Sequence, residues 1–220
     1  MDWGFYNNNN ATPKPKKIYD CAVLYEQQYF GPHFIKPVED EVFLDIGTYS
    51  GSTIIDFVNF CSNAELNYKK VIGFESSQEM IPIIHKNINR LNNVKILPYG
   101  AYSHNDKLEF YVYPDGMSFT TNMGQSIPKI IVPTRRIDDT VHEDVTFIKM
   151  DIEGAEIEAL KGAIDTIKKC KPRLAISIYH KEKDIIEIPW FIHSLVPEYR
   201  FYIRHHTFYP NWETILYAVI

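Results

Sequence analysis

Hydrophobic residues follow two alternating patterns along this chain. Short unbroken apolar runs are typical of strands buried on both faces, whereas apolar residues at three- and four-residue spacing are typical of helices. The runs predict strands at 42–46, 70–74, 94–97, 145–152, 173–179, 199–204 and 214–220, and helices that begin at 52 or span 77–91, 155–169 and 185–195. The alternation predicts an α/β fold whose sheet is mostly parallel, with one antiparallel edge strand.

Three segments depart from this alternation. Residues 1–17 contain an asparagine tract and two prolines, which predicts a flexible leader or a linker from a larger multidomain chain. Residues 18–30 are predicted to form a lid helix. Between 101 and 141 the pattern loosens into two strands, 108–113 and 129–132, around a polar loop at 118–126, and we interpret this segment as an insertion over the site. Residues 18–220 are expected to form a single domain.

Composition narrows the class of protein. The chain has 220 residues, 45% of them hydrophobic, and a formal net charge of -5, which argues against nucleic acid as the main partner because phosphate binding needs a basic face. No apolar run approaches the ~18 residues of a membrane span, and the first residues lack the apolar core of a signal peptide. Three scattered cysteines without a C-x-x-C pair are typical of reduced thiols, so we expect a cytoplasmic protein.

The turn after the first strand has the features of a nucleoside-binding loop. Gly47 and Gly51 allow the backbone to approach a ligand, and Ser52 can begin the next helix. A dinucleotide-binding loop needs G-x-G-x-x-G around a pyrophosphate, but Tyr49 occupies the middle glycine position and the anionic Asp45 ends the strand. S-adenosylmethionine carries a sulfonium and an ammonium group and no phosphate. The charge pattern therefore favours the methyl donor over NAD.

The second strand supports the same interpretation, because it ends in Glu75, an acid placed to accept both ribose hydroxyls of a nucleoside. Three alternatives remain. Asp45 and Glu75 can be ordinary strand-end carboxylates beside a tight turn; the chain can be an NAD-dependent oxidoreductase; or it can be a catalytically silent donor-binding domain of a larger biosynthetic protein.

The carboxyl ends of the predicted strands also gather acids. Asp151 and Glu153 end the 145–152 strand, and Glu156 follows one helical turn later. Such a cluster can bind a divalent cation, hold the amino end of the methyl donor, or cap the helix. A metal is possible at Asp151 and Glu153 but not expected, because no histidine or further aspartate accompanies them at ligand spacing.

A histidine near the end of the 173–179 strand is the favoured general base. Methyl transfer needs alignment of the acceptor and removal of a proton, and His180, with an ordinary pKa of ~6.5, is expected to be largely neutral in the cytoplasm. His205 and His206 are the rival bases. Each of the three can equally be a surface or core-edge histidine.

Several stretches together resemble the FkbM-type methyltransferase family. They are Phe43-Leu44-Asp45-Ile46-Gly47, Ile72-Gly73-Phe74-Glu75, Thr134-Arg135-Arg136-Ile137-Asp138, Ile148-Lys149-Met150-Asp151-Ile152-Glu153-Gly154-Ala155-Glu156, Leu160-Lys161-Gly162-Ala163 and Lys171-Pro172. The resemblance implies a Rossmann-like class I methyltransferase fold with a seven-stranded sheet and helices on both faces, S-adenosylmethionine as cofactor, and O-methylation of a sugar, glycan or polyketide-type metabolite.

The resemblance also implies roles for individual residues. It places Asp151 and Glu153 at the active centre, and His180 and His205, the candidate bases proposed from their positions at strand ends, complete the predicted catalytic set. The candidate donor-binding residues are Asp45, Gly47, Thr48, Tyr49, Gly51, Ser52, Glu75, Ser76, Gly100, Ala101 and Asp151.

Overall fold

The computed structural model describes residues 28–112, 118–119, 129–206 and 213–220. The predicted leader, residues 18–27 of the predicted lid helix and residues 120–126 of the predicted polar loop lie outside these ranges. The three described residues of the lid segment, 28–30, form a turn.

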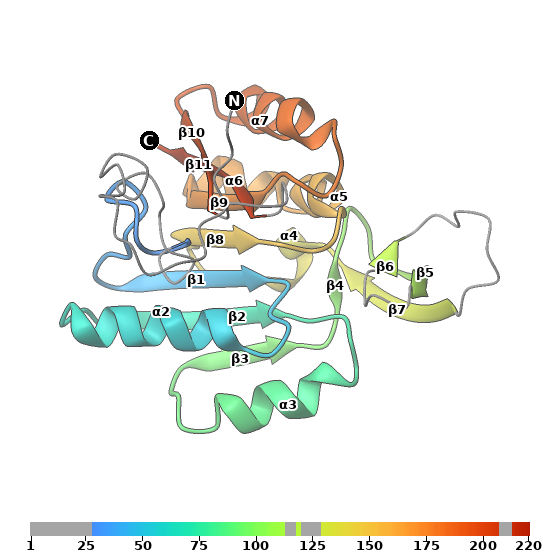
Figure 1. Ribbon diagram of the computed structural model, residues 1–220, viewed down its shortest axis with the longest axis horizontal. Coiled ribbons are helices and arrows are strands. Elements are labelled where there is room, and N and C mark those ends of the chain that lie inside the picture. Colours follow the sequence, from blue (N-terminus) through green and yellow to red (C-terminus); the bar gives the residue numbers. More distant parts are fainter. Residues whose placement is uncertain (1–27, 113–117, 120–128, 207–212) are drawn as a thin grey trace, which may run out of the picture.

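A seven-stranded sheet forms the centre of the molecule (Figure 1). Its strands lie in the order β10-β11-β9-β8-β1-β2-β3, and all neighbours pair in parallel except β11, which runs antiparallel to both β9 and β10. The bounds are β1 Glu41–Ile46, β2 Tyr68–Phe74, β3 Val94–Leu97, β8 Phe147–Met150, β9 Arg173–Ser177, β10 Arg200–His205 and β11 Thr214–Val219. The predicted α/β fold and mostly parallel sheet are confirmed.

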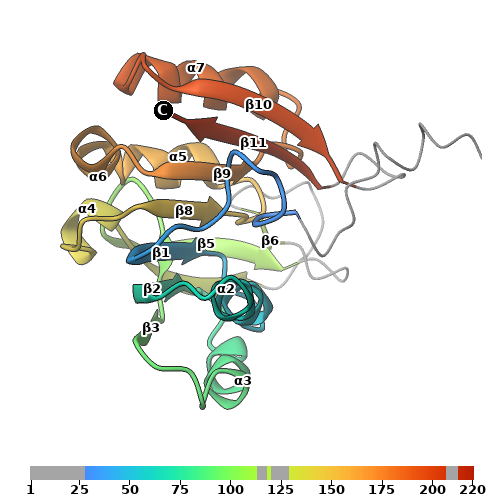
Figure 2. The ribbon, with the colours of Figure 1, turned by 90° about the vertical axis from the view of Figure 1, so that its left-hand side faces the viewer.

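Helices cover both faces of this sheet (Figure 2). The first face carries α2 and α3, and the opposite face carries α4 to α7. Their bounds are α2 Ser52–Asn63, α3 Met80–Asn87, α4 Ile137–Thr140, α5 Glu156–Lys161, α6 Ile164–Cys170 and α7 Asp184–Leu195. Each face has its own apolar core. Phe30, Phe43 and Phe57 belong to the first, and Ile148, Leu160 and Ile188 to the second.

A smaller four-stranded sheet stands beyond the carboxyl ends of β1, β2 and β3 (Figure 1). Its order is β4-β7-β5-β6, with bounds β4 Gly100–Ala101, β5 Asp106–Val112, β6 Ser118–Phe119 and β7 Lys129–Arg135. The two predicted strands of the irregular segment correspond to β5 and β7. The insertion therefore lies on the side of the main sheet where ligands bind in open α/β folds.

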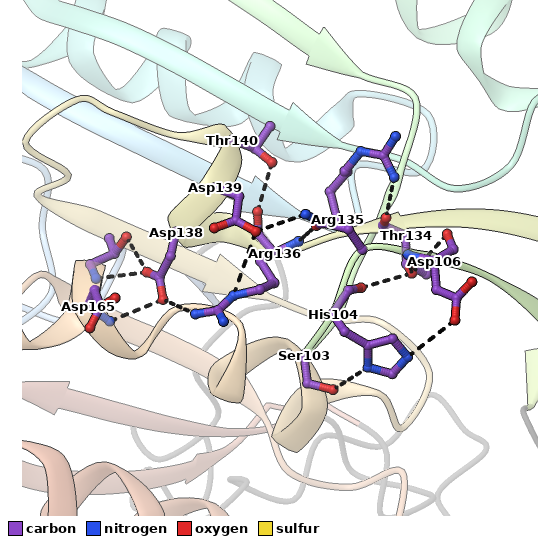
Figure 3. A network of polar contacts seen from close by, with 12 residues as sticks. Ser103, His104, Asp106, Thr134, Arg135, Arg136, Asp138, Asp139, Thr140 and Asp165 are labelled. Atoms are coloured by element: carbon purple, nitrogen blue, oxygen red, sulfur yellow. Dashed lines mark hydrogen bonds and ion pairs between the residues drawn. The ribbon is translucent and has the colours of Figure 1, made fainter.

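The helix predicted over 155–169 is in fact two helices, α5 and α6, and this prediction was wrong. Asp138 explains the break (Figure 3): its carboxylate accepts hydrogen bonds from the backbone N–H groups of Asp165 (3.2 Å) and Thr166 (2.9 Å) and from the Thr166 hydroxyl. These bonds satisfy donors that the first turn of α6 leaves unpaired. Arg136 pairs with the same carboxylate at 3.1 Å. Asp138, paired with Arg136, thus fixes the start of α6.

Candidate active site

Gly47 ends β1 at a point where only a glycine fits. Its φ is +85°, and a Cβ built on it would lie 1.9 Å from the Asp151 carbonyl oxygen, so the backbones after β1 and β8 are nearly in contact. The N–H groups of Gly47 and Thr48 both donate to the Phe74 carbonyl, at 3.0 and 3.1 Å. The ends of β1, β2 and β8 are thereby held around one turn. Gly51, also with a positive φ, is the last residue of this turn before α2 begins.

Glu75 joins this turn to the end of β2. One carboxylate oxygen accepts the Tyr49 backbone N–H at 2.7 Å and the other accepts the Ser77 N–H at 2.7 Å. Burial raises the pKa of Glu75, although both backbone bonds oppose that shift. Each oxygen has a second lone pair, so the carboxylate can still accept two hydroxyl groups.

Asp45 does not act as a free negative charge. Its carboxylate is fully buried and lies 3.1 Å from Nζ of Lys149, which also donates to the Gly47 carbonyl at 2.7 Å. Burial disfavours the charged form of Lys149, but Asp45, Asp151 and Glu75 outweigh it and raise the pKa of Lys149. The sequence predicted an anionic Asp45 and gave no sign of a counter-charge, which folding supplies by placing a lysine from β8 against it.

The other candidate donor residues surround the same turn. The buried Thr48 donates its hydroxyl to the Asp45 carbonyl at 3.0 Å, whereas Tyr49 is 68% exposed with a positive φ. Ser52 is exposed on the first turn of α2. Ser76 follows Glu75 and faces Gly100, where an added Cβ would lie 3.7 Å from that of Ser76. Ala101 is buried beside Gly100 in β4. The fold thus brings the predicted donor-binding residues to the same edge of the sheet.

Asp151 follows β8 and is held by two tyrosines. The hydroxyls of Tyr29 and Tyr179 donate to its two carboxylate oxygens, each at 3.3 Å. Burial raises the pKa of both phenols, and the negative charge of Asp151 raises it further. Both hydroxyls therefore remain protonated and can donate at neutral pH. Gln28 contacts Tyr29 at 3.2 Å and Glu213 at 2.6 Å, so the segment before β1 and the start of β11 both border the site.

His180 lies among carboxylates. Its Nε2 is 3.4 Å from Asp151 and 3.5 Å from Glu153, and its Nδ1 is 2.8 Å from Glu156. Burial lowers the pKa of His180, but Glu156, Asp151 and Glu153 outweigh burial and raise it. The expected neutral state is thus disfavoured. The role of His180 as general base remains a prediction.

The rival histidines lie elsewhere. His205 is the exposed last residue of β10, and its Nδ1 is 3.0 Å from the Thr214 hydroxyl. His206 is buried, 2.7 Å from the Tyr217 hydroxyl, which itself donates to the Gln28 carbonyl at 2.5 Å. Burial and the neighbouring Arg204 lower the pKa of His206 to about 4, so it stays neutral. This chain of bonds fixes the segment before β1.

Five residues that the structure brings to the site were not among the predicted candidates: Gln28, Tyr29, Lys149, Tyr179 and Glu213. Lys149 lies within a quoted family stretch, but no sequence pattern predicts its pairing with Asp45. Within the described ranges, none of the helices combines the length and apolar character that crossing a membrane requires.

Comparisons with known proteins identify the fold. The structure is similar to the crystal structure of methyltransferase FkbM from Methylobacillus flagellatus KT, with 26% identity and a TM-score of 0.73 over 94% of this chain and 50% of that one. An rRNA methylase from Streptococcus thermophilus is similar at 17% identity and a TM-score of 0.50, over 82% of this chain and 87% of that one. Fibrillarin from Aeropyrum pernix, solved in complex with S-adenosyl-L-methionine, is similar at 12% identity and a TM-score of 0.50, over 84% of this chain and 70% of that one. The chain therefore has a methyltransferase fold.

The family follows from the sequence itself. The model of the methyltransferase FkbM domain matches residues 45–209, about three quarters of the chain. The chain belongs to the FkbM methyltransferase family. It spans half the length of the Methylobacillus protein, and no curated protein matches it.

Proposed function

We propose that this chain transfers a methyl group from S-adenosylmethionine to a hydroxyl oxygen of a sugar, glycan or polyketide-type acceptor. The observation that carries the proposal is the fixed Glu75 carboxylate, which lies at the carboxyl ends of the parallel strands with a free lone pair on each oxygen. A carboxylate in this place suits the ribose hydroxyls of a nucleoside, in S-adenosylmethionine as in NAD. Membership of a methyltransferase family is what argues against an NAD-dependent oxidoreductase.

The residues around the first turn fit a nucleoside donor. The backbone at Gly47 has no Cβ between it and the Asp151 carbonyl, and Ser76 and Gly100 line the neighbouring strand ends. When bound, S-adenosylmethionine supplies a methyl group on a positively charged sulfur. Glu75 would hold its ribose, and the Lys149–Asp45 pair would keep the turn in position beneath it.

The acceptor side is assigned to the acids after β8. The side chains of Asp151 and Glu153 are 23% and 50% exposed, whereas that of His180 is 5% exposed, so the two acids are the members of this cluster that reach a bound molecule. They can accept hydrogen bonds from acceptor hydroxyls and align one of them. His180 lies beside both acids, and its deprotonated form can take up the hydroxyl proton.

Ligand binding tests the donor assignment directly. We expect S-adenosylhomocysteine, and not NAD, to raise the melting temperature of the purified chain and to bind in calorimetry. Stabilisation by NAD alone would contradict the proposal. Binding of S-adenosylhomocysteine without methyl transfer to any member of a glycan and polyketide panel would favour the silent donor-binding domain.

Glu75→Ala is expected to weaken binding of S-adenosylhomocysteine by about 10- to 150-fold. The lost charged hydrogen bonds contribute roughly 1.5–3 kcal/mol, and the Tyr49 N–H also loses its acceptor. The measurement is the dissociation constant by calorimetry. Glu79→Ala, at the start of α3, is the matched control and should bind normally. Equal affinity of Glu75→Ala and wild type would remove Glu75 from the donor site.

His180→Ala is expected to lower turnover by about 100-fold or more while leaving donor affinity intact, since a positioned acid–base group commonly contributes 10²–10⁴. Turnover is measured as S-adenosylhomocysteine release with the best acceptor from the panel. His104→Ala is the control, because His104 is exposed on the insertion. Normal turnover in His180→Ala would show that the proton leaves by another route.

A further inference from the structure

Four carboxylates converge on the single imidazole of His180. Asp151, Glu153 and Glu156 approach its two nitrogens at 2.8–3.5 Å, and Asp184, at the start of α7, also interacts with it electrostatically. They come from the end of β8, the start of α5 and the start of α7. The cluster therefore exists only in the folded chain, at the sheet edge assigned to the acceptor.

The inner groups of this cluster lack hydrogen-bond partners. The His180 side chain is 5% exposed, and neither ring nitrogen makes a well-aligned hydrogen bond to the described residues. Glu156 is fully buried; one of its oxygens accepts the Ile152 N–H at 2.9 Å, and the other has no hydrogen-bond partner in the described part of the chain. A buried carboxylate oxygen without a hydrogen bond is costly, so this second oxygen of Glu156 is placed for a ligand that the described residues do not supply.

We propose that Asp151, Glu156 and His180 bind a divalent transition-metal ion. One ligand atom from each of the three lies within 4.8 Å of those from the other two. Ligand atoms held at about 2.0–2.2 Å from one ion lie up to about 4.4 Å apart, so small side-chain adjustments complete the site. The second ring nitrogen of His180 can then donate to a neighbouring carboxylate, as in most metal-bound histidines.

The donor set favours some ions over others. One imidazole nitrogen with carboxylate oxygens suits Mn²⁺ or Zn²⁺, whereas Mg²⁺ and Ca²⁺ prefer oxygen ligands alone. The excess of negative charge fits a divalent cation. The sequence interpretation disfavoured a metal because no histidine accompanied the acids, but folding places His180 beside Asp151 and Glu156.

This inference rests on the proposed function for its purpose. A cation at this edge of the sheet would bind the acceptor hydroxyl oxygen and lower its pKa, and it would thereby assist loss of the proton. With the ion bound, His180 would act as a metal ligand and no longer as the general base. Asp151 would then contribute to both binding sites. Its backbone carbonyl packs against the Gly47 turn of the proposed donor site, and its carboxylate would bind the ion of the proposed acceptor site.

Metal binding can be measured without any methyl donor or acceptor. The full chain is stripped with a chelator and titrated with Mn²⁺, with free Mn²⁺ followed by electron paramagnetic resonance, and with Zn²⁺ in calorimetry. We expect one ion per chain, tighter than Mg²⁺. Asp151→Asn, Glu156→Gln and His180→Gln should each weaken binding at least about tenfold. Glu158→Gln is the matched control on the same helix, because Glu158 contacts Ser103 and Lys161 instead.

The outcomes separate this inference from the proposed function. Failure of wild type to bind Mn²⁺ or Zn²⁺, or an equal effect of Glu158→Gln, overturns the metal site. Asp151→Asn, whose side chain is partly exposed, remains informative if a buried variant fails to fold. Binding of S-adenosylhomocysteine is measured on the same stripped samples. If the chain binds this compound but no metal, only the metal site is contradicted. If it binds the metal but not this compound, only the proposed function is contradicted.

Discussion

Lys149→Ala is expected to lower the free energy of unfolding by about 3–5 kcal/mol, because it leaves the fully buried Asp45 carboxylate without its counter-charge. The substitution also removes the donor to the Gly47 carbonyl, so the turn after β1 should lose one of its fixed contacts. Urea denaturation at neutral pH measures the loss. Lys70→Ala is the control: Lys70 pairs with Glu143 at a partly exposed position and should cost less than about 1 kcal/mol.

Two further measurements distinguish the buried charge from simple loss of packing. Asp45→Asn combined with Lys149→Met should recover most of the stability, since no buried charge remains. Burial already raises the pKa of Asp45, and removal of Lys149 raises it further. A raised folded-state pKa favours folding at low pH and loses that contribution as pH rises through it. The loss of unfolding free energy in Lys149→Ala, relative to wild type, should therefore become smaller as the pH is lowered from 7 to 5. A loss that does not change with pH would contradict this account.

Gly47→Ala is expected to destabilise the fold by about 3 kcal/mol or more and to abolish measurable donor binding. The left-handed conformation alone costs a non-glycine residue roughly 1–3 kcal/mol, and the added Cβ would lie 1.9 Å from the Asp151 carbonyl oxygen. Because that oxygen belongs to the backbone, the ends of β1 and β8 must separate. Chemical denaturation and calorimetry with S-adenosylhomocysteine measure the two effects.

Gly51→Ala isolates the conformational part of this cost. Its φ of +86° is almost the same as that of Gly47, but its Cβ would first meet the Ile88 side chain at 3.2 Å, which can adjust. We expect a loss of roughly 1–2 kcal/mol with measurable donor binding. Equal losses for the two variants would show that contact between the β1 and β8 ends does not govern the turn.

The main elements of the fold were predictable because each carries a local signal. Buried parallel strands have unbroken apolar runs, and the predicted strand at 94–97 matches β3 residue for residue. Helix boundaries were less predictable. The two helices α5 and α6 have one continuous apolar stripe, and the break between them depends on Asp138, which lies more than 25 residues earlier in the chain.

The positions of the candidate residues were predictable to a similar extent. A turn after one strand and an acid after the next leave a pattern in the sequence, and this pattern placed Gly47, Gly51 and Glu75 at one edge of the sheet. The partners of these residues leave none. Lys149 is 104 residues from Asp45, yet parallel pairing of β1 with β8 places the two directly opposite each other.

The sequence alone determined the layered fold, the family and the glycine-containing turn after β1, since these depend on periodicity, glycines and the types of residue at strand ends. Only the tertiary structure decided the charge of the site. Asp45 is neutralised by Lys149, and His180 is surrounded by Asp151, Glu153 and Glu156. The physical reason is that electrostatic interactions act through space at a few ångströms, and which charges come that close is decided by strand order and burial.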